Sequence, residues 1–143
     1  MTLSTRSTYG LRALFILAKL TENSHLSLSS LAKEANIPYK YLEQVFILLR
    51  KAGLVIASTG SRGGYRLARQ PNQIKLGQVV RALDGTIAPV SCVSRIAYAK
   101  CSCPDEDSCS LRAAMEEVRS AIIAVIDNKT LADYLPDSEG IGK

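Results

Sequence analysis

Residues 28–67 read LSSLAKEANIPYKYLEQVFILLRKAGLVIASTGSRGGYRL, and the elements predicted here set the architecture of the chain. Ser27 is a suitable N-cap for a short helix that runs through Ala35. Asn36-Ile37-Pro38 then forms a turn, because proline fits the first turn of a new helix. That second helix extends to about Lys51. The stretch therefore predicts two short helices joined by a tight turn.

A β-hairpin follows the two helices. Residues 54–58 and 65–68 are short runs prone to form strands, and the glycine-rich segment 59–64 separates them. A helix pair followed by a hairpin is the order of a winged helix-turn-helix, in which the second helix enters the major groove of DNA and the hairpin lies beside it. The first helix of the pair only supports the second.

The flanking sequence predicts more helices. Residues 4–20, 76–83 and 109–127 carry apolar side chains at helical spacing, and residues 131–135 complete one more turn. The fold class is mainly α with a small β-hairpin. We expect four regions: a winged helix-turn-helix domain (1–85), a cysteine-rich sensor loop (86–110), a dimerisation helix with a short terminal helix (109–135) and a flexible tail (136–143).

Composition and charge restrict the function classes. The 143 residues carry a net charge of +5, and 47% of them are hydrophobic, which suffices for a core. Residues 1–75 hold 11 Lys and Arg against 3 Glu, whereas residues 76–143 hold 7 against 10 Asp and Glu. A basic front half predicts a polyanionic partner for that half, although a chance imbalance of surface charge would give the same numbers. The start lacks the pattern of a secretory signal and no apolar run is long enough to cross a membrane, so we expect a cytoplasmic protein.

The residues predicted to contact double-stranded DNA lie on the second helix and the hairpin. The helix presents polar side chains outside its apolar stripe: Tyr39, Lys40, Tyr41, Glu43 and Gln44. Gln44 suits adenine, and Glu43 suits the amino group of cytosine. Arg50, Arg66 and the hairpin tip, with Ser61, Arg62 and Gly63, suit phosphates or the minor groove. The alternative is a winged helix that contacts protein, with these residues as a solvated face.

All four cysteines lie within 18 residues, at Cys92, Cys101, Cys103 and Cys109. In a reducing compartment, disulfides are not expected to persist, so clustered thiols indicate metal ligands or a redox switch. Iron–sulfur clusters prefer thiolate ligands. Zinc and a metal-free thiol switch remain alternatives.

The last long helix carries a broad apolar stripe. Its predicted dimerisation residues are Leu111, Met115, Val118, Ile122 and Val125. Packing within one subunit would also produce such a stripe. Because the front domain already has its own core, we expect this helix to pair with its copy in a two-fold homodimer.

The strings YLEQ (41–44), LRKAGLV (49–55) and GGY (63–65) resemble the IscR/NsrR/CymR family of bacterial regulators. Similarity extends over roughly residues 1–135. The resemblance implies a homodimeric repressor or activator and a role for Glu43 in operator choice. One departure lies in the wing, where Thr59 stands at a position that is often arginine in relatives.

The resemblance also bears on the cysteines. Several members ligate an iron–sulfur cluster, [2Fe-2S] or [4Fe-4S], through three cysteines in this loop, which implies Cys92, Cys103 and Cys109 here. One type adds a histidine at the position of Arg112, which cannot ligate. Cys101, an oxygen ligand from Asp105, Glu106 or Asp107, or a residue of the partner subunit is left as the fourth ligand.

We therefore expect a regulator that senses iron–sulfur, redox or nitric oxide status. A cluster carrier and an adaptor whose protein partner controls DNA binding are the competing classes. The sequence contains no Ser-His-Asp set, phosphate-binding glycine loop or histidine-rich metal site, so we expect neither an enzyme nor a small-molecule substrate.

Overall fold

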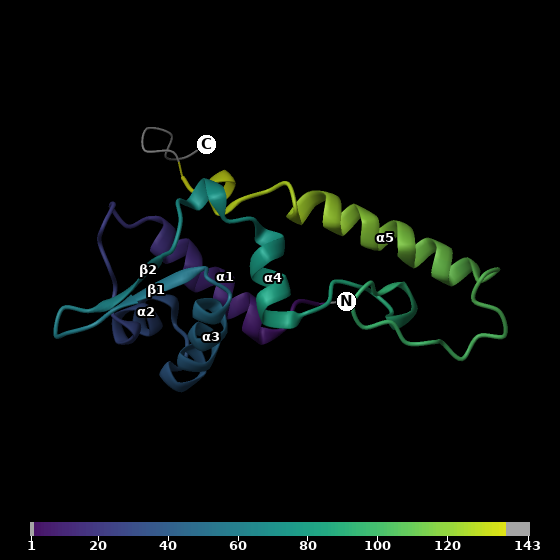
Figure 1. Cartoon of the computed structure of the whole chain (residues 1–143), viewed down its shortest axis with the longest axis horizontal. Coiled ribbons are helices and arrows are strands. Elements are labelled where there is room, and N and C mark those ends of the chain that lie inside the picture. Colours follow the sequence, from purple (N-terminus) through teal and green to yellow (C-terminus); the bar gives the residue numbers. More distant parts are fainter. Residues whose placement is uncertain (1, 137–143) are drawn as a thin grey trace.

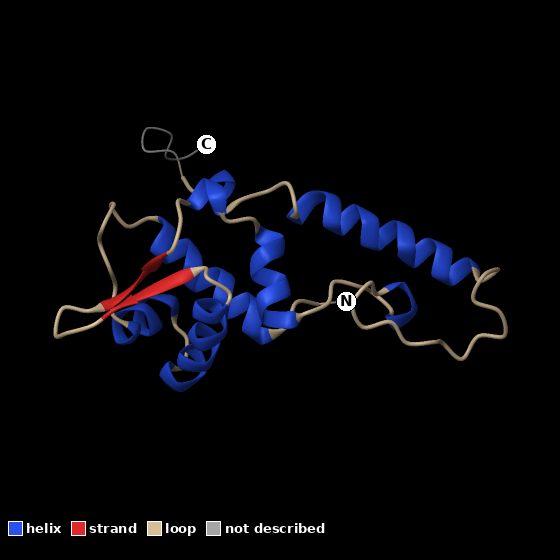
Figure 2. Ribbon diagram, viewed as in Figure 1, coloured by secondary structure: helices blue, strands red, loops and turns tan. Residues whose placement is uncertain are grey.

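A computed structural model describes residues 2–136 (Figure 1). Five α-helices and one antiparallel hairpin are its main elements (Figure 2). In chain order they are α1 (Thr5–Ala18), α2 (Leu28–Ala35), α3 (Tyr39–Lys51), β1 (Val55–Ser58), β2 (Gly64–Leu67), α4 (Leu76–Asp84) and α5 (Ser110–Ile126). Three short 3-10 turns, η1 (Pro71–Gln73), η2 (Ser91–Val93) and η3 (Leu131–Tyr134), complete the structure. The mainly α fold with a small hairpin is confirmed.

The core lies where α1, α2, α3, α4 and the hairpin meet. Its largest fully buried side chains come from every one of these elements or from the segments beside them: Phe46, Leu14, Leu31, Leu42, Leu49, Leu54, Ile74, Leu131, Val45 and Val79. Each helix of this group is amphipathic and buries one face. We call residues 5–84 the body of the molecule.

Two helix starts follow the capping rule. The Ser4 side chain accepts a hydrogen bond from Ser7 N at the start of α1, and the Ser27 side chain accepts one from Ser30 N at the start of α2. Serine is favoured at this position because its oxygen pairs with an N–H that the helix leaves free. The N-cap predicted at Ser27 is therefore confirmed.

The structure also corrects some expectations. Helix α1 is shorter than the predicted 4–20 at both ends, and residues 131–134 form a 3-10 turn rather than a helix to residue 135. On α3, Phe46 is buried, whereas Ala52, which follows the last residue of the helix, is exposed. The predicted tail lies outside the described residues except for Pro136.

Beyond α4 the chain leaves the body and forms an arm, residues 86–127, which contains the cysteine loop and α5. Figure 1 shows α5 extending away from the body with the loop running beside it. The chain then returns, because Leu76 N donates to Lys129 O at 2.9 Å and Leu131 N donates to Ile74 O at 3.0 Å. The C-terminal end of the arm is therefore fixed to the body.

Candidate nucleic-acid interface and cysteine loop

Helix α3 presents a polar face because its apolar residues point into the core. Leu42, Val45, Phe46 and Leu49 are buried. Of the predicted DNA contacts on this helix, Tyr39, Lys40, Gln44 and Arg50 are exposed, whereas Tyr41 and Glu43 are half-buried. Exposed polar side chains on a helix of this kind can meet base edges in a major groove.

The half-burial of Tyr41 has a structural cause. Its ring packs edge-on against Tyr9 of α1, with ring centroids 5.2 Å apart, and the guanidinium of Arg12 lies 5.2 Å from the Tyr9 ring centroid. Arg12 also donates to the Ala35 carbonyl at 3.2 Å. Tyr41 therefore holds α3 against α1, a packing contact that the sequence pattern did not reveal.

The turn between α2 and α3 fixes the angle of the helix pair. Asn36 ends α2 in the left-handed region, with φ 54°, and its backbone N–H bonds to the last turn. Asparagine tolerates this conformation better than most residues. Ile37 is buried directly after it. The predicted Asn36-Ile37-Pro38 turn thus presents α3 rigidly rather than as a loose extension.

The hairpin forms a wing whose tip is open to solvent. Ser61 and Arg62 are exposed, and Gly63 is half-buried. The base of the wing is anchored, because the Tyr65 ring packs edge-on against Phe46 at 4.8 Å and Tyr65 N donates to Leu26 O at 2.8 Å. The predicted arginine tip is thus held on a fixed base beside α3.

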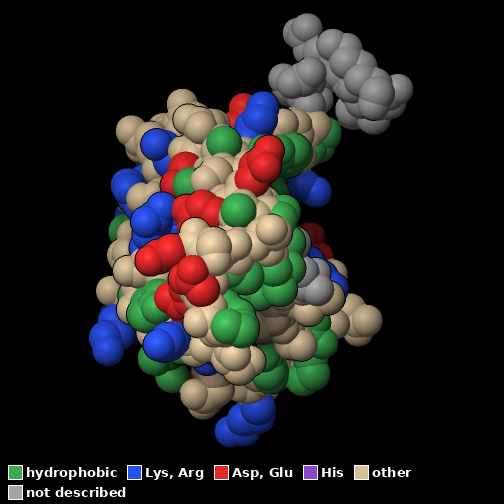
Figure 3. All heavy atoms as spheres, turned by 90° about the vertical axis from the view of Figure 1, so that its right-hand side faces the viewer, with side chains coloured by type: hydrophobic (Ala, Val, Ile, Leu, Met, Phe, Trp, Pro, Cys, Tyr) green, Lys and Arg blue, Asp and Glu red, His purple; other side chains and the backbone are tan. Residues whose placement is uncertain are grey.

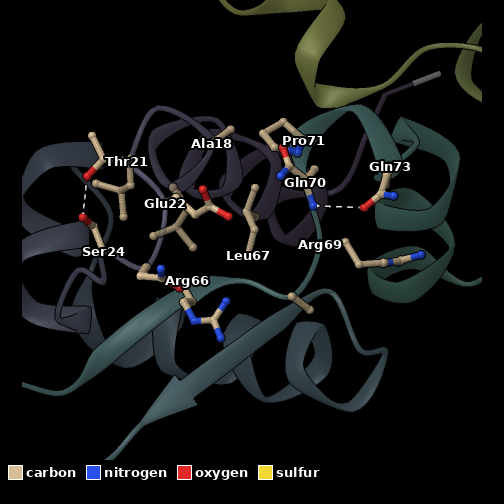
Figure 4. Close-up of a pocket in the computed structure, with 14 residues that line it drawn as sticks. Ala18, Thr21, Glu22, Ser24, Arg66, Leu67, Arg69, Gln70, Pro71 and Gln73 are labelled. Carbon is tan, nitrogen blue, oxygen red and sulfur yellow. Dashed lines mark hydrogen bonds between the residues drawn. The ribbon is translucent and has the colours of Figure 1, made fainter.

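Arg66 lies in a different setting from Arg62. It lines a cleft of about 430 Å³ between the turn after α1, strand β2 and η1. Figure 4 shows Arg66 and Glu22 beside this cleft, with Arg69 farther along it. Since β2 pairs Arg66 with Ile56 at mid-strand, this arginine is not part of the wing tip.

The first part of the cysteine loop is anchored by buried side chains. Cys92 is 7% exposed, and Val93 and Ser94 beside it are also buried. The Ser94 hydroxyl accepts from Ala97 N at 2.9 Å and shares a hydrogen bond with the Thr86 hydroxyl at 2.7 Å. The loop predicted to lack regular structure therefore contains the short turn η2 and an ordered cysteine.

Two cysteines form a disulfide, contrary to the expectation of four free thiols. Cys101 is bonded to Cys103, and their Cα atoms are 5.4 Å apart, within the range that a disulfide spans. Cys92 and Cys109 are free. The irregular Cys101-Ser102-Cys103 backbone brings the two sulfurs together, which no periodic pattern predicts.

The same loop also brings together three side chains that could bind a metal ion. One sulfur each from Cys92 and Cys101 and one carboxylate oxygen of Glu106 all lie within 4.8 Å of one another. Glu106 accepts hydrogen bonds from the Tyr98 hydroxyl and from Cys101 N, and the Tyr98 hydrogen bond is the main reason that the pKa of Glu106 is lowered. Three acidic residues were considered as an oxygen ligand. Of these, Glu106 lies in this group, and Asp105 and Asp107 do not.

Cys109 occupies the N-cap of α5. Its sulfur accepts a hydrogen bond from Arg112 N at 3.4 Å. The positive end of the helix therefore faces this thiol. Cys109 is outside the group formed by Cys92, Cys101 and Glu106.

An ion pair joins the arm to the body. Arg81 of α4 donates two hydrogen bonds to Asp127 at the end of α5, at 2.6 and 3.0 Å. This pairing lowers the pKa of Asp127 and raises that of Arg81. A Cβ atom at Gly77 would collide with Asp127 Oδ1, so a side chain at this position would force the carboxylate of the ion pair to shift.

These features define a class of protein: a winged helix-turn-helix DNA-binding regulator with an appended cysteine loop. The chain belongs to the Rrf2 family, described as "Iron-dependent Transcriptional regulator", whose model matches residues 3–137. Within the described residues, no helix combines the length and apolar character needed to cross a bilayer.

Individual relatives agree with this assignment. The rrf2-like HTH-type transcriptional regulator of Rhodobacter capsulatus is 37% identical over 131 residues, covering 89% of this chain and 87% of the relative. The structure of CymR, the global cysteine regulator of Bacillus subtilis, matches with a TM-score of 0.77 at 34% identity, covering 93% and 95% of the two chains. T. potens IscR matches with a TM-score of 0.73 at 35% identity, covering 93% and 85%. The relatives are named as transcriptional regulators and not as enzymes, which confirms the expected class and family.

Proposed function

We propose that this regulator is a homodimer that binds specific DNA sites through α3 and the wing and senses iron–sulfur or redox status through its cysteine loop. The observation that carries the proposal is the separation of the two parts. The body presents an exposed polar helix beside an arginine-tipped wing, whereas the arm holds all four cysteines. The proposed DNA-binding surface and the proposed sensor thus lie in different parts of the molecule.

DNA binding is supported by the side chains that surround α3. Lys40, Arg50 and Arg62 are exposed and can pair with phosphates, while Gln44 is exposed in the first half of the helix and suits adenine. Phosphate contacts fix the register of the protein, and base contacts select the sequence. We therefore assign most of the affinity to the cations and most of the selectivity to Gln44 and Glu43.

Dimerisation is supported by the exposure of α5. None of its 17 residues is buried, and two of its large apolar side chains are mostly open to solvent: Leu111 is 63% exposed and Val125 is 53% exposed. With 100° of rotation per residue, five apolar residues fall on one stripe, and all of them except the half-buried Val118 are exposed: Leu111, Ala114, Val118, Ala121 and Val125. Figure 3 faces this end of the molecule and shows hydrophobic side chains open to solvent beside acidic ones.

Two of the predicted dimerisation residues lie at the inner border of this stripe. Met115 and Ile122 are half-buried, and the helical rotation places them toward the side of α5 that faces its own chain. A second copy packed on the Leu111–Val125 stripe would cover the exposed residues and bring two α3 helices into one complex. Small alanines along the stripe would let the two helices approach closely.

The donor set of the loop fits an iron–sulfur cluster. Cysteine sulfurs are its usual ligands, and Cys92, Cys101, Cys103 and Cys109 all lie on one loop between the body and α5. When bound, a cluster supplies a centre that gains or loses electrons and is lost on oxidation. Cys92 would hold it to η2, and Cys109 would hold it to the start of α5.

This arrangement also supplies a route for regulation. Changes in the loop act on α5 through Cys109, and α5 acts on α4 through the Arg81–Asp127 pair. Since α4 packs against α1 and α3 in the body, a shift of the arm would alter the spacing of the two α3 helices in a dimer.

A metal-free thiol switch is the second candidate. The Cys101–Cys103 disulfide favours it, because a bond between neighbouring cysteines can form and break with the redox state of the compartment. In this case the disulfide itself would reshape the loop, and no cluster would be needed.

The decisive experiment combines DNA binding with a visible spectrum of protein purified without oxygen. Promoter DNA should bind with an affinity that falls steeply as the salt concentration rises. Arg62→Ala should weaken this binding and reduce the slope of log K against log salt by about one. Lys100→Ala, an exposed charge on the arm, should leave both unchanged. A colourless preparation would favour the thiol switch, and equal binding of all DNA sequences would contradict the regulator.

A further inference from the structure

The cysteine loop brings together three donors of a kind that metals use. The Cys92 sulfur, the Cys101 sulfur and a Glu106 carboxylate oxygen lie within 4.8 Å of one another. In a tetrahedral site with bonds of about 2.0–2.3 Å, neighbouring ligand atoms are roughly 3.5 Å apart. The donors therefore need to move by only about an ångström to share one ion.

Glu106 is held in place by its own neighbours. Its carboxylate accepts from the Tyr98 hydroxyl and from Cys101 N, the latter at 3.0 Å, and its backbone carbonyl accepts from Cys109 N at 3.3 Å. These contacts fix the carboxylate against the backbone of one of the two cysteines. Hydrogen bonds that orient a ligand in this way are common around metal sites.

Cys92 is fixed from the opposite side. It lies in the turn η2 and is 7% exposed, so this cysteine is largely shielded from solvent. Cys101 and Glu106 are half-buried. The group is therefore more accessible to solvent at Cys101 and Glu106 than at Cys92.

The segment 101–103 is closed by the Cys101–Cys103 disulfide, which occupies the Cys101 sulfur. We infer that reduction of this disulfide opens a metal site whose ligands are the Cys92 and Cys101 thiolates and the Glu106 carboxylate. The inference rests on the proposed sensor function of the loop, and it assigns Glu106 as the oxygen ligand. A divalent ion of the zinc or iron type suits two thiolates and one carboxylate.

The chemistry balances with an external thiol as reductant. Two thiols of the reductant supply two electrons and two protons, their own sulfurs become a disulfide, and the Cys101–Cys103 bond gives two thiols. Binding of the ion then releases one proton from Cys92 and one from Cys101. Cys103 is not a ligand in this site. Its disulfide bond with Cys101 blocks the site until the bond is reduced.

This division of roles can be tested with two variants that both lack the disulfide. Co²⁺ is the probe, because its visible absorption reports thiolate ligands, and it is titrated into the full chain without oxygen. Wild type should bind Co²⁺ only after reduction. Cys103→Ser should bind it with or without reductant, whereas Cys101→Ser should bind it at least about tenfold more weakly in both cases.

Glu106 is tested in reduced protein against a neighbouring carboxylate. Glu106→Gln should weaken Co²⁺ binding at least about tenfold and shift the absorption bands, and Asp107→Asn, an exposed residue outside the group, should do neither. Equal behaviour of Cys101→Ser and Cys103→Ser, or unchanged Co²⁺ bands in Glu106→Gln, would overturn the inference.

The same proteins separate this inference from the proposed function. Iron and sulfide are supplied to each reduced variant, and cluster formation is followed by its visible absorption. Unchanged Co²⁺ binding in Cys101→Ser and Glu106→Gln, together with a cluster in wild type, would overturn the inference and leave the cluster sensor standing. Co²⁺ binding as described, without any cluster in wild type, would overturn the cluster and leave the ligand assignment standing.

Discussion

Every helix of the body buries one face, whereas α5 in the arm buries none of its 17 residues. The two regions have similar local character, since both contain amphipathic helices with apolar residues at helical spacing. They differ in what covers the apolar face. In the body the neighbouring helices cover it, and in the arm one short loop covers only part of it.

The body, together with Leu131 from the segment after the arm, closes its own core, whereas the arm leaves an apolar stripe that the proposed second subunit would cover. A single helix without tertiary packing is marginal in water. The arm would gain its missing contacts from a second subunit along α5 and from a metal centre within the loop. Its order would therefore depend on protein concentration, metal and redox state, which are suitable inputs for a sensor.

The largest effect should come from the body. Phe46 is fully buried, and its ring packs against Tyr65 at the base of the wing. Phe46→Ala should lower the free energy of unfolding by about 3–5 kcal/mol, measured by urea denaturation. Ile47→Ala changes a side chain that is 55% exposed, and it should cost less than about 0.5 kcal/mol. Similar losses for both variants would mean that α3 is not packed as described.

A charge on the α5 stripe should instead break the assembly and spare the subunit. Ala121 is exposed on this stripe, so Ala121→Glu should leave the monomer folded and weaken dimerisation by about 3 kcal/mol, roughly a hundredfold in Kd. Sedimentation measures the shift from dimer to monomer. Ser120→Glu adds the same charge on the far side of the helix and should remain dimeric. Loss of both dimers, or of neither, would contradict the assigned face.

On the reading surface, a smaller and more selective effect is expected. Gln44→Ala removes an exposed side chain without touching the core, so it should cost about 2 kcal/mol of discrimination at one base pair and little elsewhere. Binding to a set of operators with single substitutions measures it. A uniform loss over all sites would show that Gln44 contacts the backbone of the DNA rather than a base.

Local signals in the sequence predicted most of the body. Apolar residues at helical spacing, the Ser27 cap and the turn ending at Pro38 were enough to place α2 and α3, and the glycines around Arg62 were enough to place the wing. These signals work because each depends on neighbours within a few residues. The contact between Tyr41 and Tyr9 escaped prediction because it joins two helices far apart in sequence.

The cysteine loop was predictable in composition and not in geometry. The sequence indicated clustered sulfur ligands. It also offered three acidic residues as possible oxygen ligands, with nothing to distinguish Glu106 from the other two. Selection required coordinates, because the loop has no periodic pattern to fix which side chains meet. The pairing of Cys101 with Cys103 was likewise unexpected, since it depends on the local path of an irregular backbone.

The smallest effect should come from the joint between the two regions. Arg81 and Asp127 are 37% and 35% exposed, so solvent screening limits their ion pair to about 0.5–1 kcal/mol. Because the pKa of Asp127 is lowered in the folded protein, this contribution is present above the ordinary aspartate range and is lost as pH falls through the lowered value. Asp127→Asn should therefore destabilise the protein slightly at pH 7, and the difference from wild type should shrink as the pH falls below the ordinary aspartate pKa of about 4. Urea denaturation over this pH range measures the change, and a difference of constant size would assign the effect to packing against Gly77 instead of charge.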